Sequence, residues 1–178
     1  RSEAPGWLHR LWAASGMARS RRPQRSASDL FEALEERRLL ATFTVDSLAD
    51  TIDGSDGVTT LREAIIESNA TEVRDVILFD ASLAGGSVNL TGGPLGITRG
   101  VRIEGLDAGL LDISGQDAVR VFSIDLVDSG VVTISKMTIR SGATSGNGAG
   151  VLIENDGTLE LRDVVLRDNA AGTWGGSV

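Results

Sequence analysis

The strongest constraint on the fold is a repeat that aligns with itself without a gap. Residues 131–151 (VVTISKMTIRSGATSGNGAGV) match residues 158–178 (TLELRDVVLRDNAAGTWGGSV) at a constant offset of 27 positions. Most apolar positions face apolar positions, and four pairs are identical: Arg140/Arg167, Ala143/Ala170, Gly148/Gly175 and Val151/Val178. Short β-branched runs, broken by glycine, asparagine and serine at such a period, are typical of a β-solenoid, in which each unit buries its apolar face against the next.

Strand-like segments dominate the chain from residue 76 onward. They are four to six residues long and cover residues 76–79, 87–90, 95–98, 101–104, 110–113, 119–124, 131–134, 137–140, 151–154, 158–161 and 164–167. No stretch after residue 70 has helical periodicity, so short bends must connect the strands. This pattern excludes a βαβ fold and leaves a solenoid or a sandwich. The gapless register favours the solenoid, because sandwich strands have no reason to repeat in register.

The repeat also predicts which side chains fill the interior. Alternation along the strands points one set of aliphatic side chains inward, where burial of each contributes about 1.5–3 kcal/mol. We expect these side chains to stack in columns: Ile134, Ile139, Leu161 and Leu166. Asn169 is expected at a bend, with a left-handed backbone and with its amide bonded to the free polar groups of the corner.

Charged residues one period apart are expected to be neighbours on the outside of the stack. Lys136 and Asp163 would form an opposite-charge pair, worth roughly 0.2–1 kcal/mol. Arg140 and Arg167 would repel each other unless they splay apart, share an anion or share Asp168. Together, Asp163, Asp168, Arg140 and Arg167 are the only outward cluster with the chemistry of a polysaccharide-degrading site.

A short helix is predicted ahead of the strand-rich region, over residues 60–69. It begins with the sequence TLRE, a capping box in which the Thr60 hydroxyl and the Glu63 carboxylate satisfy free N–H groups. Asn69 is suited to end it. Arg62 and Glu63 have the chemistry of catalytic residues, but the capping box accounts for Glu63, and a salt bridge at the surface or in the cap accounts for Arg62.

The loop before this helix contains three aspartates that suggest a calcium site: Asp50, Asp53 and Asp56. Their spacing lacks the alternating ligands, the glycine at position six and the glutamate at position twelve of an EF-hand loop. Asp53 and Asp56 each precede a glycine, and Asp-Gly turns need no metal. Both interpretations stay open, and no other cofactor is expected.

The segment around the predicted helix resembles the Cys-Ser-Leu-Arg-Glu-Ala domain. The matching residues are Leu61, Arg62, Glu63, Ala64, Ile65 and Asn69, whereas Thr59 and Thr60 stand where that family has its Cys and Ser. In the family, an aspartate-rich loop and a short helix precede a parallel β-helix. The resemblance therefore implies that the helix covers the open end of the solenoid.

The later coils resemble right-handed β-helix repeats of polymorphic outer-membrane proteins. Those repeats have Gly-Gly-Ala-Ile and Phe-x-x-Asn signatures, and the corresponding segments here are residues 148–151 (GAGV), 175–178 (GGSV) and 166–169 (LRDN). The resemblance implies a right-handed parallel β-helix in an exported or surface-displayed protein.

The N-terminal 41 residues differ in composition from the remainder. They carry a net charge of +3, against −11 for the rest of the chain. Residues 1–28, which include the only histidine (His9) and a candidate initiator (Met17), are basic and are expected to be disordered. Residues 29–42 predict a short helix, in which LEERRLL resembles the Leu-Glu-Pro-Arg-x-Leu-Leu export motif, with Glu36 in place of the proline.

Composition narrows the classes of function. The acidic body argues against nucleic-acid binding, and no run approaches the roughly 18 apolar residues of a membrane helix. Cysteine is absent, which excludes disulfides and thiolate metal sites. The lone histidine argues against a serine-hydrolase triad.

These observations predict a mainly β chain: a basic tail, a targeting-like helix, a cap over residues 43–75 and a right-handed parallel β-helix over residues 76–178, truncated at its C-terminus. The expected function is a non-enzymatic scaffold or adhesin-like protein of the extracellular space, cell surface or outer membrane. Its partner would be an unidentified carbohydrate or protein ligand, and further coils of a longer array are expected. The alternative is a pectate-lyase-like or polygalacturonase-like β-helix enzyme, although a shared fold does not by itself imply an activity.

Overall fold

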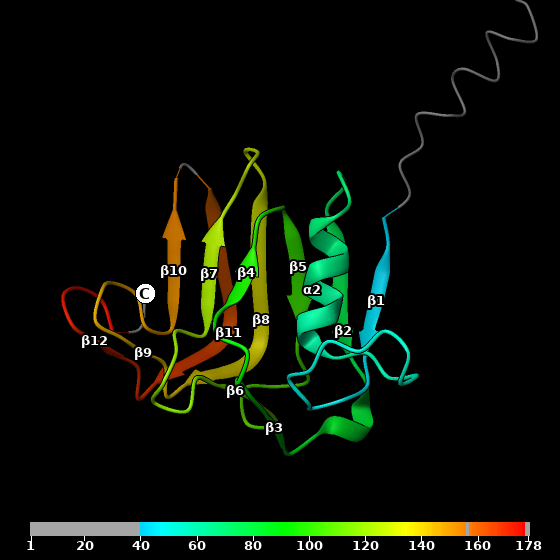
Figure 1. Cartoon of the computed structure of the whole chain (residues 1–178), viewed down its shortest axis with the longest axis horizontal. Coiled ribbons are helices and arrows are strands. Elements are labelled where there is room, and N and C mark those ends of the chain that lie inside the picture. The colour runs from blue at the N-terminus through cyan, green and yellow to red at the C-terminus, as the bar shows by residue number, and fades with distance from the viewer. Residues whose placement is uncertain (1–39, 156, 177–178) are drawn as a thin grey trace, which may run out of the picture. The chain divides into compact units, whose positions relative to one another are not determined.

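The computed structural model describes residues 40–155 and 157–176. In this part of the chain, parallel strands stack as a β-solenoid of about four turns, with one short α-helix near the N-terminal end (Figure 1). The predicted solenoid is therefore confirmed. The expectations for residues 1–28, and for all but the end of the segment 29–42, lie outside the described residues.

The longest stack contains β1 (Thr42–Val45), β2 (Asp75–Phe79), β5 (Val101–Glu104) and the first halves of β8 (Val131–Arg140) and β11 (Thr158–Arg167). Every pair in this stack is parallel. One inward position of each strand lies over the next, which gives the column Phe43, Ile77, Ile103, Ile134 and Leu161. Such a column removes aliphatic surface from water at every turn.

Two further faces complete each turn. The second stack contains β3 (Gly86–Asn89), β6 (Leu111–Ser114) and the second halves of β8 and β11, and it carries the column Val88, Ile113, Ile139 and Leu166. The third contains β4 (Leu95–Ile97), β7 (Phe122–Asp125) and β10 (Val151–Glu154). The two-residue strands β9 (Ala143–Thr144) and β12 (Ala170–Ala171) pair between the second and third faces.

The predicted offset of 27 holds in the last two turns, where Ile134 pairs with Leu161 and Ile139 with Leu166. Earlier turns differ in length: Asp75 pairs with Val101, 26 residues later, whereas Arg102 pairs with Thr133, 31 residues later. Most of this difference arises in the connections on either side of the third face, which are residues 90–94 and 98–100 in the first turn and residues 115–121 and 126–130 in the second. The corner between the first two faces also varies, but only in the later turns. Residues 105–110 form that corner in the second turn, but a single residue forms it in the third and fourth.

That single-residue corner joins segments expected to be separate strands. β8 bends at Lys136 (φ 56°) and β11 at Asp163 (φ 52°), one above the other. The same spacing recurs at the next corner, where Ser141 (φ 50°) and Asp168 (φ 55°) are left-handed. The backbone conformation thus repeats at the period of the sequence.

The left-handed residue of the fourth-turn corner is Asp168, not Asn169 as predicted. Asn169 contributes its side chain instead. Its Oδ1 accepts a hydrogen bond from the Gly142 N–H (2.8 Å), and its Nδ2 donates to the Ile139 carbonyl (3.1 Å). The amide therefore satisfies polar groups of the turn below, because the preceding residue already makes the reversal.

Burial along the columns depends on the turn. Ile134 and Ile139 are fully buried, whereas Leu161 and Leu166 are partly buried and pack against the core from the last described turn. All four belong to the predicted interior, so the inward alternation is as expected.

Candidate functional site

The helix α2 (Leu61–Asn69) has the capping box expected from the sequence. The Thr60 hydroxyl accepts from the Glu63 N–H, and the Glu63 carboxylate accepts from the Thr60 N–H at 2.9 Å. That carboxylate also accepts from the Asp53 N–H at 2.6 Å, which ties the preceding loop to the helix. Hydrogen bonds from the backbone of Thr60 and then of Asp53 lower the pKa of Glu63. Glu63 is thus an ionised structural acceptor.

The helix takes the place of a strand beside the edge of β4. The Asn69 Nδ2 donates to the Gly96 carbonyl (2.8 Å), and its Oδ1 accepts from the Thr98 N–H (2.9 Å). Arg62 donates to the carbonyls of Gly93 (2.7 Å) and Pro94 (3.2 Å). Side chains of α2 therefore bond backbone groups that a neighbouring strand would otherwise bond, and the helix covers this edge.

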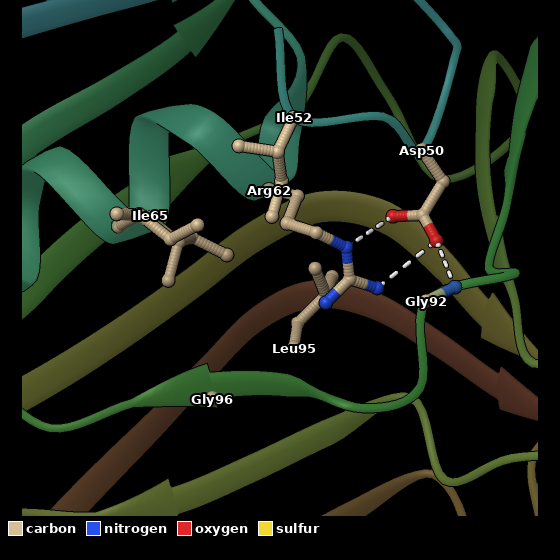
Figure 2. A pocket seen from close by; sticks show the side chains of 8 residues that line it. Asp50, Ile52, Arg62, Ile65, Gly92, Leu95 and Gly96 are labelled. Atoms are coloured by element: carbon tan, nitrogen blue, oxygen red, sulfur yellow. Dashed lines mark hydrogen bonds and ion pairs between the residues drawn. The ribbon is translucent and has the colours of Figure 1, made fainter.

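A buried ion pair lies between this helix and the loop before it (Figure 2). The Arg62 guanidinium donates to Asp50 through Nε (2.8 Å) and Nη2 (3.0 Å), and the two side chains are only 11% and 1% exposed. Asp50 also accepts from the backbone N–H groups of Thr91 (2.6 Å) and Gly92 (2.8 Å). Burial acts to raise the pKa of Asp50, but the hydrogen bonds from Arg62, Gly92 and Thr91 outweigh it and hold that pKa below its ordinary value.

One hollow adjoins the ion pair, and a second hollow adjoins the first. The first, of about 260 Å³, is lined by Asp50, Ile52, Arg62, Ile65, Ile66, Gly92, Leu95 and Gly96 (Figure 2). The second, of about 440 Å³, shares Ile52 and Ile66 with the first and adds Val58, Glu63 and Glu67 to its lining. Because Asp50, Arg62 and Glu63 are each engaged by several partners, these hollows offer apolar contact and negative charge rather than a free acid–base pair.

The structure does not bring the calcium candidates together. Asp50 bonds Arg62, Asp53 accepts from the N–H and hydroxyl of Ser55, and Asp56 accepts from the Val58 N–H. Within the described ranges, no group of three acidic or histidine side chains is placed to hold a metal ion. Asp53 and Asp56 accept hydrogen bonds within turns of their own loop.

The outward Arg–Asp cluster differs from the predicted one. Arg140 and Arg167 share the carboxylate of Asp112, at 2.5 and 3.4 Å, and Arg167 also pairs with Asp168 at 3.1 Å. This shared acid, which sequence reasoning missed, resolves the expected repulsion between the two arginines. It lies on β6, where the offset to β8 is 26 rather than 27 residues, so the repeat gave no signal for it.

Lys136 and Asp163 are neighbours in the stack, as predicted, and Asp163 attracts Lys136 electrostatically, but the hydrogen-bonded partner of Lys136 is a different carboxylate. Lys136 bonds Glu104 instead, at 2.6 Å, and this hydrogen bond raises the pKa of Lys136. The reason is the register: Glu104 of β5 pairs with Ser135, the residue beside Lys136, on the turn below. The carboxylates bonded to Arg140 and Arg167 are those of Asp112 and Asp168, not that of Asp163.

Comparisons of the chain with protein-family models, with curated proteins and with solved structures found no match. Among the described residues, none of the helices has the length and apolar character needed to cross a membrane.

Proposed function

We propose that this chain is a non-enzymatic β-solenoid scaffold of an exported or cell-surface protein. The proposal rests on one observation: the charged residues whose chemistry could serve catalysis are bonded to other parts of the fold. Asp50, Arg62 and Glu63 close the N-terminal cap, and the outward arginines are neutralised by Asp112 and Asp168. These charged groups therefore stabilise the packing of the cap and of neighbouring turns.

The resemblance of the cap and coils to surface-protein repeats supports the location part of this proposal, as does the acidic body, which stays soluble through self-repulsion. Cell fractionation of the full-length product, combined with protease treatment of intact cells, tests it. We expect the product in the secreted or surface fraction, cleaved by external protease. A product found wholly in the cytosol and protected from protease would contradict the proposal.

Further coils are also proposed to stack on β11. Its Leu159, Leu161, Val164 and Leu166 are partly buried on one side only, and an added turn would complete their burial. If the coding sequence after residue 178 continues in frame, it should encode more coils of 20–30 residues punctuated by glycine and asparagine.

A polysaccharide-degrading enzyme is the second candidate, favoured by the juxtaposition of Arg140, Arg167, Asp112 and Asp168 on one outer face. Elimination needs a free basic arginine or lysine, and hydrolysis needs two carboxylates across the scissile bond. Incubation with acidic polysaccharides, followed by detection of unsaturated and reducing ends, separates the candidates. The scaffold proposal predicts no release of either product, and release that depends on Arg140 would establish the enzyme.

A further inference from the structure

Three β-branched side chains are exposed together on the N-terminal cap. Ile52 is 66% exposed, Val58 40% and Ile66 47%. They line the two adjoining hollows, and Ile52 and Ile66 belong to both. Single exposed aliphatic residues are ordinary, but a concave apolar surface of this kind indicates a binding site. We name these three residues and their hollows the cap patch.

The charge around the cap patch has one sign. Glu67 lines the larger hollow, and within the part of the chain that the structure describes its carboxylate has no hydrogen bond or ion pair. Asp53 and Asp56 each precede a glycine that lines the larger hollow, and their carboxylates accept only from neighbouring turn residues. Arg62, the one cationic side chain in the lining of either hollow, is already held by Asp50 and two carbonyls. The patch therefore presents apolar contact inside an unneutralised negative rim.

We propose that the cap patch binds a cationic peptide segment that carries aliphatic side chains. Its aliphatic groups would enter the two hollows, and its lysine or arginine side chains would pair with Glu67, Asp53 and Asp56. The negative rim disfavours anionic lipid and nucleic acid as occupants. It equally disfavours the cap patch of a second copy, because like charges would then face each other. This inference does not depend on the location or the scaffold role proposed above.

The test uses the full chain and a fluorescein-labelled synthetic peptide of leucine and lysine at helical spacing, with binding followed by fluorescence anisotropy. We expect saturable binding that weakens as salt is added. Glu67→Gln should weaken it about two- to fivefold, as expected for one exposed ion pair. The double variant Ile52→Thr/Ile66→Thr should weaken it more than about tenfold, because two apolar contacts are lost.

Matched controls separate the cap patch from nonspecific attraction to an acidic protein. Glu154→Gln removes an exposed carboxylate elsewhere, and Val127→Thr alters an aliphatic side chain that is 69% exposed. Both should bind as the parent chain does. Circular dichroism and urea unfolding establish that every variant is folded.

Three outcomes would overturn the proposal. In the first, Glu67→Gln and Glu154→Gln weaken peptide binding equally. In the second, the folded Ile52/Ile66 double variant binds the peptide as tightly as the parent chain does. The third is concentration-dependent self-association in sedimentation velocity that this double variant abolishes, because the patch would then be an interface between copies.

Discussion

Replacement of Arg62 by methionine tests how the cap is held. The change keeps the aliphatic stem but removes the cation from a carboxylate that is 1% exposed, and it leaves the carbonyls of Gly93 and Pro94 without their donors. Breaking a buried ion pair from one side costs about 3–5 kcal/mol. Arg102→Met is the matched control, because Arg102 is half exposed in its pair with Glu104, and such surface pairs contribute at most about 1 kcal/mol.

The pH dependence of this loss has a defined sign. In the parent chain the pKa of Asp50 is below its unfolded value, so its contribution is complete above the unfolded pKa and is lost as the pH falls through the folded pKa. Without Arg62, burial acts on Asp50 with less compensation and favours the neutral acid. The stability gap between the parent and Arg62→Met should therefore narrow as the pH falls below about 4.

Urea unfolding at neutral and acidic pH measures both effects. If Arg62→Met lowers the free energy of unfolding by less than about 1 kcal/mol at pH 7, or by no more than Arg102→Met does, the reasoning from burial is refuted. A gap that is unchanged between pH 7 and low pH would show that Asp50 is not the group responsible.

Three further variants test other parts of the fold by the same unfolding assay. Ile134→Ala should lower the free energy of unfolding by about 2–5 kcal/mol. Leu161→Ala in the same column should lower it less, because Leu161 is only partly buried. Equal losses would contradict the difference in burial. Gly142→Ala should be destabilising by about 1–3 kcal/mol, because its Cβ would overlap the Ala149 carbonyl, whereas Gly109→Ala meets no atom and should be near neutral. Asn69→Ala should cost about 1–3 kcal/mol, since two hydrogen bonds to the β4 edge are lost; a silent change would mean that α2 does not cap this edge.

Sequence reasoning succeeded where the physical determinant is periodic. The pairs Ile134/Leu161 and Ile139/Leu166 were predictable because the last two turns have single-residue corners of the same kind. The capping box was predictable because its partners are three residues apart. In both cases, a fixed spacing along the chain determines which atoms meet.

Long-range partners depend on corner lengths, which vary between turns. Two such partners lie outside the 27-residue register. One is Asp112, the acid that two arginines share, and the other is Glu104, the partner of Lys136. Asp50 reaches Arg62 through an irregular loop without any periodic signal. At the corner before Asn169, the usual preference of asparagine for left-handed backbone suggested the wrong residue, since Asp168 adopts that conformation.

The central claim is that residues 27 apart in the last two turns lie directly above each other in parallel strands. The chain has no native cysteine, so the double variant Thr138→Cys/Val165→Cys places two thiols at one register pair. Neighbouring strands put the two Cα atoms within the roughly 4.4–6.8 Å that a disulfide spans. Mild oxidation followed by mass spectrometry should show an intramolecular disulfide in this variant and little in the out-of-register control Thr138→Cys/Arg162→Cys. Equal cross-linking of the two folded variants, or none at the 138/165 pair, would contradict the stacked arrangement.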